Sequence, residues 1–494
     1  MKNLLYIISL CGLLTACDLQ EEPYGFYSDD NFYKSETDAE SGLLYAYNAL
    51  TFLEYSRGIF YIGDIPTETM SPKSDEAGDV YQLENWIANR ETEQLQYYFK
   101  YCYIAINRAN TVIDHIQNSS GLSETARRRI LGEAYFLRAW NYFNLVRTFG
   151  IVPVQTKMVA ELSQTTPPMA TGLDQLYDLI LGDLTRADNL LEVNKVFGRA
   201  DKVAAQSLMA KAYLTIASSK EHNVHRYTEM RREPRIMYDS AAYWAGKVVR
   251  DYKNVYDFDT NLRDIYDVDK PTGPEHIFIM PIDRSGTQEG NYSKLPLLFL
   301  PSNNSVPFYI RYGNGDLQRA NGNGWGVFLC NDEFVETQFS TTDKRRTELI
   351  HRDIYDASGN PIVPNQVKGY FSSKYVDPDF IGERTSARPY LIRFSDIAFV
   401  YTDPAGPEAG LAYVNRIRER AGVTPLPSGM TTDKFREAVI KERALELAFE
   451  GNRLYDLRRT ASVTTTDIKA AGLSEAEAAS YPIPQREIDL NPNL

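Results

Sequence analysis

Histidine and cysteine are scarce in this chain, which has five histidines and four cysteines among its 494 residues. A carboxylate-bridged di-metal site in a helix bundle needs pairs of Glu-x-x-His motifs on facing helices, and the sequence offers no such pair. The catalytic signatures Gly-x-Ser-x-Gly and His-Glu-x-x-His and the phosphate-binding loop are missing as well. These absences argue against the common hydrolase, metalloprotease and nucleotide-binding classes, and we predict neither a cofactor nor a bound metal.

An excess of basic residues is missing too. The chain has 53 Lys and Arg against 66 Asp and Glu, a formal charge of −13, and no stripe of positive residues stands out. Nucleic acids attract proteins through clustered positive charge, so we expect no nucleic-acid partner.

The apolar run at the N-terminus is too short to cross a membrane, which takes about twenty apolar residues. Lys2 precedes apolar residues 4–14, a pattern typical of a signal peptide over residues 1–16. The Leu-Thr-Ala before Cys17 resembles a bacterial lipobox, which predicts a lipidated Cys17 and a tether over residues 17–35. The alternative is an ordinary signal peptide with an incidental cysteine. Cys102 and Cys330 would be the only other thiols of the mature protein.

Aromatic residues, by contrast, are abundant. The chain contains 34 Tyr, 22 Phe and 4 Trp, and 43% of its residues are hydrophobic. This composition supports a sizeable core, and aromatic rings also provide the flat apolar faces on which sugar rings stack.

Helical periodicity dominates most of the chain. Apolar residues recur at three- and four-residue steps, and helices are predicted over residues 36–55, 91–117, 123–148, 172–191, 199–218, 238–250, 408–421 and 438–460. Residues 275–280 are predicted to be a strand or an extended segment. The long helices joined by short polar connections indicate antiparallel helix pairs.

The predicted helix 438–460 carries an unusual polar stripe made of Glu442, Glu446 and Glu450. Like charges four residues apart repel, so these carboxylates need cations nearby. Arg443 and Arg453 are candidates within the same helix, and Arg416, Arg418 and Arg420 are candidates in the preceding one. We interpret the stripe as a half-buried ionic seam between two helices. A metal or acid–base site is the alternative that the absence of Glu-x-x-His pairs disfavours.

Three motifs in the chain resemble the SusD/RagB family of outer-membrane lipoproteins. They are ERALELAFEGNRLYDLRR at residues 442–459, GEAYFLRAWNYF followed by FGIVPV at 132–143 and 149–154, and PIPQREIDLNPNL at 482–494. The resemblance covers essentially the whole mature chain and is weakest between residues 220 and 330. It implies a mainly α-helical fold of TPR-like helix pairs with long irregular ligand-binding insertions.

The resemblance also implies a domain plan. It places a SusD-like body at residues 36–494, with N-terminal helices at 36–260, an irregular ligand-binding insertion at 261–390 and C-terminal helices at 391–494. Residues 388–422 depart from the family pattern because Pro404 and Gly406 interrupt the run, and proline there is predicted to end the first helix early. The closing motif also lacks the usual last few residues.

Two long irregular segments are the predicted sites of function, because ordered loops on a rigid scaffold commonly carry binding residues. Residues 57–90 are rich in Gly and Pro and end near Trp86, which could instead fill a gap in the core. Residues 285–326 combine aromatic residues with asparagines, which suits a sugar because it has an apolar face and a rim of hydroxyls. The candidate ligand-binding residues are Trp86, Tyr309, Tyr312, Asn314 and Trp325, predicted to share one shallow surface. The alternative is a loop folded on its own aromatic residues.

By this resemblance the protein would be a surface-exposed lipoprotein of the outer membrane that is not an enzyme. It would bind an oligomeric nutrient, a glycan, and pass it to a SusC-like TonB-dependent transporter. Capture of a peptide by the same architecture is one alternative. A secreted glycoside hydrolase is another, but it needs two carboxylates roughly 5 to 9.5 Å apart in a cleft, and the regular carboxylates here fall on packing helices.

Overall fold

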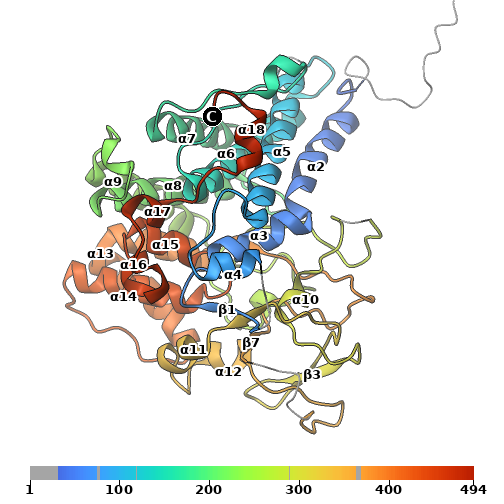
Figure 1. Cartoon of the computed structure of the whole chain (residues 1–494), viewed down its shortest axis with the longest axis vertical. Coiled ribbons are helices and arrows are strands. Elements are labelled where there is room, and N and C mark those ends of the chain that lie inside the picture. Colours follow the sequence, from blue (N-terminus) through green and yellow to red (C-terminus); the bar gives the residue numbers. More distant parts are fainter. Residues whose placement is uncertain (1–31, 75–77, 118, 289, 363–368) are drawn as a thin grey trace, which may run out of the picture.

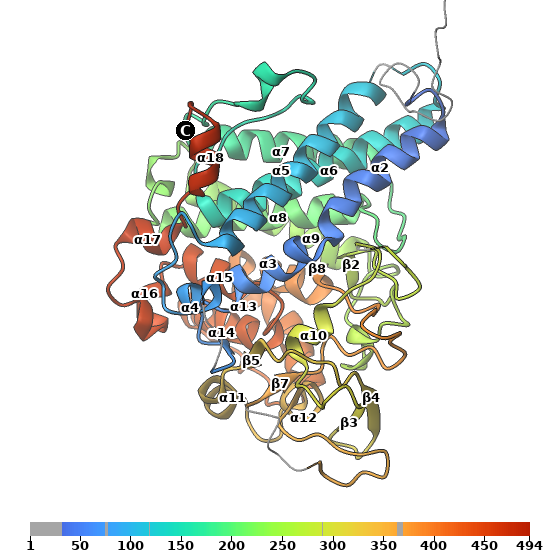
Figure 2. The same ribbon diagram turned by 45° about the vertical axis from the view of Figure 1, so that its right-hand side comes forward.

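The computed structural model describes residues 32–74, 78–117, 119–288, 290–362 and 369–494. The predicted signal peptide, the predicted lipidation site Cys17 and most of the tether lie outside the described residues. Helices form the larger part of the body, and an irregular part with short strands lies at one end of it (Figures 1 and 2). The predicted mainly α-helical architecture is confirmed.

The first half of the described chain is a stack of helices. Its members are α2 (Glu36–Thr51), α3 (Leu53–Gly63), α4 (Asp79–Glu84), α5 (Glu93–Ile116), α6 (Glu124–Phe149), α7 (Leu173–Leu190), α8 (Lys202–Glu221) and α9 (Pro234–Asp251). Each long helix packs on the next, α5 on α6, α6 on α7, α7 on α8 and α8 on α9. The predicted boundaries of α5 to α8 are correct to within three residues, while α9 begins earlier because Pro234 occupies its first turn.

Helix α6 lies inside this stack and is buried on nearly all sides from Ile130 to Val146. Gly132 allows the close packing there, since a Cβ at this position would lie 2.7 Å from Cγ of Leu191. The absence of a side chain at Gly132 therefore lets the segment around Leu191 approach α6.

The irregular part contains short elements. These are β2 (His276–Ile279), α10 (Leu295–Phe299), β3 (Phe308–Arg311), β4 (Leu317–Ala320), β5 (Phe328–Cys330), α11 (Asp332–Gln338), α12 (Lys344–Leu349), β6 (Ile350–His351), β7 (Phe371–Ser372) and β8 (Tyr390–Arg393). With β1 (Met70–Pro72) the strands form four antiparallel pairs, β1–β5, β2–β8, β3–β4 and β6–β7. The pairs β1–β5 and β2–β8 join segments that lie far apart in the sequence.

The C-terminal part returns to the helical stack. It comprises α13 (Phe394–Arg420), α14 (Thr432–Glu446), α15 (Arg453–Arg459), α16 (Val463–Thr466), α17 (Glu475–Ala479) and α18 (Gln485–Leu490). Helix α13 packs on α9 and α14. It is interrupted at Gly406, whose φ of 71° is not helical, so the predicted early end of its first half is observed beside Pro404 and Pro407.

The prediction of one helix over residues 438–460 is wrong. Helix α14 ends at Glu446 and α15 starts at Arg453, and the turn between them contains Phe449 with φ 65° and Gly451 with φ 74°. Helix α14 begins at Thr432, where the hydroxyl of Thr431 accepts the hydrogen bond from the Lys434 N–H.

Side chains from elsewhere stabilise this break by bonding the carbonyls that a continuous helix would use. Nζ of Lys374 donates to the carbonyls of Glu446 (3.2 Å) and Ala448 (2.9 Å), and the Tyr375 hydroxyl donates to that of Phe449 (2.7 Å). Helix α3 also packs on the turn, because a Cβ on Gly63 would lie 2.3 Å from the Gly451 carbonyl oxygen.

Residues 57–90 are less irregular than predicted, since they include the end of α3, strand β1 and helix α4. Cys102 and Cys330 are both buried free thiols, and burial raises the pKa of each. In the part of the chain that the structure describes, no helix combines the length and the apolarity that a membrane span requires.

Candidate functional site

The carboxylate stripe that the sequence singled out belongs to a buried ion network. The network joins the five carboxylates of Asp343, Glu275, Glu442, Glu446 and Glu450 with the five cations of Arg345, Arg393, Arg418, Arg420 and Lys374. All but Arg418 are almost completely buried. Because the charges balance and lie out of water, the arrangement is that of a structural core.

Glu446 lies at the centre of this network. Its carboxylate lies 2.7 Å from Nη2 of Arg420 and 2.9 Å from Nη1 of Arg393. Burial alone would raise the pKa of Glu446, but the nearby arginines hold it below its ordinary value. Glu275 responds in the same way, with a pKa lowered to about 2 by Arg420 and Arg393 against the effect of burial. Both groups are therefore charged at neutral pH and fully paired, which leaves neither as a proton donor or acceptor.

The predicted partners of the stripe are only partly correct. Arg418 and Arg420 do pair with Glu442 and Glu446. Arg443, however, pairs with Asp396 (2.8 Å) and Asp456 (2.9 Å).

The other two predicted partners lie outside the network. Arg453 pairs with Glu68 and Arg416 with Asp257. The missing cations come from residues 345, 374 and 393, which no helical periodicity could connect to α14. Among the described residues, no group of three His, Cys, Asp or Glu is placed to hold a metal ion.

Trp86 does not lie on a binding surface. Its side chain is 7% exposed, its Nε1 donates to Oδ2 of Asp467 (3.2 Å), and its ring stacks on Tyr481 at 6.2 Å. The assignment of Trp86 to an exposed ligand surface is therefore contradicted. The ring instead joins the segment after α4 to the C-terminal part of the chain.

The two irregular segments do meet, as expected, but at β1 and not at Trp86. Ser71 pairs with Leu329 in the β1–β5 ladder, and the Lys73 N–H donates to the Val327 carbonyl at 3.3 Å. This pairing places Pro72, the last residue of β1, opposite Phe328, three residues after Trp325.

Trp325 is the predicted binding residue with the most accessible aromatic ring, at 40% exposure. Its backbone is firmly held, because its N–H donates to the Leu297 carbonyl at 2.5 Å. Gly324 before it packs so tightly that a Cβ would lie 2.0 Å from the Leu300 carbonyl oxygen, and Gly326 after it has a φ of 59°. The chain thus presents an exposed indole from a rigid backbone, an arrangement suited to binding a flat apolar face.

Two further exposed apolar side chains flank the segment that carries Trp325. Val306 is 59% exposed, and its backbone packs against Gly322. Ile381 is 47% exposed and lies beside Gly382, whose carbonyl accepts from Nδ2 of Asn321. Neither carried a signal in the sequence, because single apolar residues in irregular segments have no periodicity.

Tyr309 and Asn314 belong to the β3–β4 hairpin. Tyr309 is half-buried and exchanges both backbone hydrogen bonds with Tyr355, at 2.8 and 2.9 Å. Asn314 lies exposed at the tip, where its Nδ2 donates to Asp316 (2.6 Å) within the turn. Its amide therefore serves the turn in this structure.

Tyr312 is only 7% exposed and borders a separate polar hollow of about 390 Å³. Its hydroxyl donates to Gln318, the Arg263 guanidinium lies 4.5 Å from its ring centre, and burial raises its pKa to about 12. Three acidic residues of one loop, Asp264, Asp267 and Asp269, also line the hollow. The five predicted residues thus occupy different places, with Trp325 on an open surface, Tyr312 in a polar hollow and Trp86 in the core.

The fold and these sites define a class of protein. It is a TPR-like helical scaffold, and its irregular part presents the exposed side chain of Trp325 from a rigid backbone. The carboxylates of Glu442, Glu446 and Glu450 are paired with cations inside the protein.

Comparisons with known proteins agree with this class. A family described as "Starch-binding associating with outer membrane" matches residues 33–214, and the SusD family matches residues 341–494. The chain belongs to the SusD/RagB family, as its motifs indicated.

Similar proteins align over most of the chain. SusD-like protein P38 of Formosa agariphila is 25% identical and covers 99% of this chain and 97% of its own, and SusD-like protein P2 of the same species is 23% identical and covers 92% and 89%. Among solved structures, a laminarin-binding SusD-like protein has a TM-score of 0.74 at 21% identity, covering 93% of this chain and 98% of that one. Surface glycan-binding protein A from Bacteroides thetaiotaomicron, in complex with laminarihexaose, has a TM-score of 0.71 at 19% identity, covering 92% and 97%.

Proposed function

We propose that this protein is a cell-surface lipoprotein that binds an oligomeric glycan and delivers it to a SusC-like TonB-dependent transporter in the outer membrane. The observation that carries the proposal is the exposed, backbone-locked indole of Trp325. A pyranose has an apolar face that stacks on such a ring, and a rigid ring loses little entropy when it binds. The similar proteins described as laminarin-binding or complexed with laminarihexaose support a glycan as the ligand class.

The same geometry supports binding without catalysis. The carboxylates of Glu442, Glu446 and Glu450 lie in the buried network and pair with cations. A glycoside hydrolase needs a proton-donating carboxylic acid and a second carboxylate at an open cleft. These three residues do not provide that pair.

The direct test is calorimetric titration of the purified protein with laminarin and starch oligosaccharides and, separately, with oligopeptides. We expect binding to a glycan, and Trp325→Ala should weaken it by about thirtyfold, because aromatic anchors commonly contribute ~2 kcal/mol or more. Tyr243→Ala on α9 is the matched control, since Tyr243 is also an exposed aromatic residue, at 55%, but lies in the helical stack. If the protein bound peptides and no glycan, the proposed ligand class would be wrong. If the two substitutions changed the affinity equally, the binding site would lie elsewhere.

Anchoring requires a separate test. We expect Cys17→Ala to release the protein from membranes of the producing cell, because a cysteine that carries several acyl chains gives lasting attachment. Membrane fractionation with fatty-acid labelling measures this, and a variant that stays in the membrane fraction would contradict the lipobox interpretation. Recovery of a TonB-dependent transporter with the wild-type protein after mild cross-linking would test the partner.

A further inference from the structure

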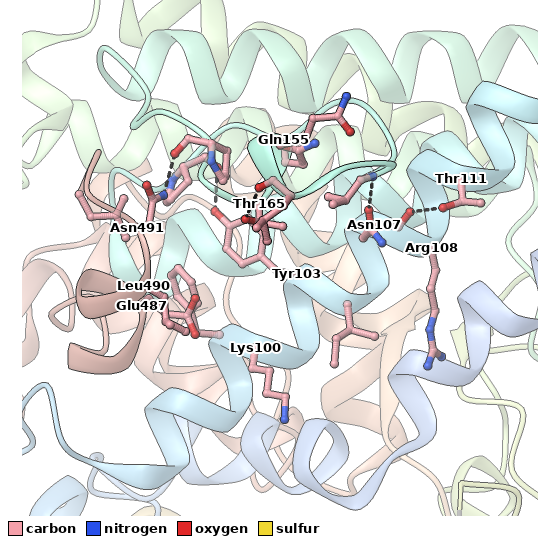
Figure 3. A pocket seen from close by; sticks show the side chains of 18 of the residues that line it. Lys100, Tyr103, Asn107, Arg108, Thr111, Gln155, Thr165, Glu487, Leu490 and Asn491 are labelled. Carbon is pink, nitrogen blue, oxygen red and sulfur yellow. Dashed lines mark hydrogen bonds between the residues drawn. The ribbon is translucent and has the colours of Figure 1, made fainter.

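An open groove of about 850 Å³ runs along α5, away from Trp325 and the polar hollow. Figure 3 shows its floor, formed by α5 with Lys100, Tyr103 and Arg108, between Leu490 of α18 and the loop of residues 153–167 that includes Thr165. The floor and the two sides come from three separate segments of the sequence.

Large apolar side chains gather at this groove without being covered. Leu162 is 84% exposed, Leu490 63% and Tyr45 59%. Single exposed apolar residues are common on protein surfaces, but a cluster around one hollow marks a place where another chain packs.

The groove is already formed in the described structure. The Tyr103 hydroxyl donates to the Pro153 carbonyl (2.7 Å), and Oδ1 of Asn107 accepts from the Val159 N–H (3.1 Å). Where this loop meets the end of α18, Nδ2 of Asn491 donates to the Pro167 carbonyl (2.8 Å). A partner would therefore enter a site that needs little reorganisation.

The N-terminal part of the chain enters the described structure at one end of this groove. Tyr33 lines the groove and stacks on His115, in the last turn of α5, with ring centres 4.6 Å apart. Residues 24–31 precede it directly. Eight extended residues span ~27 Å, and the groove floor from Phe99 to Thr111 covers twelve helical steps, ~18 Å. The segment is thus long enough to follow the groove over its whole length.

The sequence of the segment also suits the groove. Tyr24, Phe26 and Tyr27 supply three aromatic rings for an apolar floor. Residues 24–28 contain no charged side chain, and the groove lining includes both cations, Lys100 and Arg108, and an acidic residue, Glu487. The apolar character of both the segment and the groove therefore points to this occupant.

We propose that residues 24–28 of this chain bind in the groove along α5, with their aromatic side chains between α18 and the loop of residues 153–167. Because the segment is covalently attached, its effective concentration at the groove reaches the millimolar range, so weak contacts are enough to keep it bound.

Docking would also determine how the body sits above the membrane, a consequence that rests on the proposed lipid anchor at Cys17. Only the residues between Cys17 and Tyr24 would remain free, which limits the reach of the tether to ~25 Å instead of ~50 Å. The face that carries α5 and α18 would then be held near the membrane.

Disulfide cross-linking in the soluble Cys17→Ala chain tests the docking independently of anchoring and of glycan binding. The experimental pair is Ser28→Cys with Val159→Cys, since Val159 lies in the groove and is 37% exposed. The control pair is Ser28→Cys with Val196→Cys. Val196 is 47% exposed and lines a different hollow, which also includes Glu40 in the first half of α2. The native Cys102 and Cys330 are buried and should not compete.

We expect the groove pair to form an intramolecular disulfide at least about tenfold faster than the control pair. Replacing Tyr24, Phe26 and Tyr27 by serine should abolish the difference without changing the melting temperature. Equal rates for the two pairs would overturn the proposal. Cross-linked dimers would assign the groove to a second copy, and protection of Val159→Cys from a thiol reagent only when the transporter is present would assign it to that partner, so either result would also overturn it.

Discussion

The segments around Trp86 and Trp325 look alike in sequence but differ in the structure. Neither segment has a clear helical pattern in its sequence, and each contains one tryptophan. Residues 57–90 are rich in Gly and Pro, and residues 285–326 are rich in Gly and Asn. Trp86 is 7% exposed and hydrogen-bonded to Asp467, whereas Trp325 is 40% exposed. The difference arises because the C-terminal segment, with Asp467 and Tyr481, covers Trp86. A tryptophan in an irregular segment thus becomes a core residue or a binding residue according to which distant segment packs beside it.

The ion network extends this comparison to charged residues. Glu442, Glu446 and Glu450 also suggested a functional site, yet cations from four separate segments enclose them. An unusual cluster of charged residues in the sequence can belong to a functional site or to the core. Here the carboxylates have partners inside the protein, so they serve stability.

The buried network should show the largest effect on stability. We expect Glu446→Ala to lower the free energy of unfolding by ~3 to 5 kcal/mol, because Arg393 and Arg420 would lose the buried carboxylate between them. Thermal or denaturant unfolding measures this, with the exposed Glu437→Ala on the same helix as control. A variant that kept wild-type stability would contradict the structural role of the network.

Trp86→Ala should come next, with a loss of ~3 kcal/mol in unfolding free energy, since it removes a buried ring and leaves a cavity. Glycan affinity of the folded variant should stay unchanged. A loss of affinity at constant stability would restore Trp86 to the binding surface and remove the contrast with Trp325.

Asp64 predicts a pH dependence within the same buried region. Its Oδ2 accepts from the Gly451 N–H at 2.7 Å, and burial raises its pKa from 3.8 to about 7, an increase to which Glu450 adds and which Lys374 and the backbone N–H groups oppose. The pKa of Asp64 is higher in the folded protein than in the unfolded chain. Its contribution to the free energy of unfolding is therefore fully present below about pH 4 and is lost as the pH rises to about 7.

Asp64→Asn removes this titration. The stability of the variant relative to wild type should therefore increase by up to ~1.4 kcal/mol per pH unit between these limits. Unfolding curves of both proteins from pH 4 to 8 measure the difference, and a constant difference across this range would show that Asp64 does not titrate there.

Trp325→Ala should have the smallest effect on stability, within ~0.5 kcal/mol, because its exposed ring contributes little to the core. The same variant should lose glycan affinity. Its melting curve should therefore resemble that of the wild type, while its calorimetric titration should show weaker binding. If both fell together, the region around Trp325 would be part of the core like that of Trp86.

Much of the helical stack could be predicted from local patterns. Helices α5 to α8 follow from the spacing of apolar residues and from short polar connections, because helices of 18 to 26 residues need no distant information to be recognised. The break between α14 and α15 could not be predicted in this way. It depends on Lys374 and Tyr375, which bond the freed carbonyls from more than seventy residues away.

The sequence by itself determined the family, the helical scaffold, the presence of an irregular part and the special character of residues 442–450 and 285–326. The tertiary structure decided which polar and aromatic side chains are buried and paired inside the protein and which stay exposed. Arg345, Lys374 and Arg393 enclose the glutamates, Asp467 and Tyr481 cover Trp86, and the β1–β5 pairing places Trp325 beside the end of β1. Exposure depends on contacts between segments hundreds of residues apart, whereas periodicity and motifs report only what lies within a few turns of the chain.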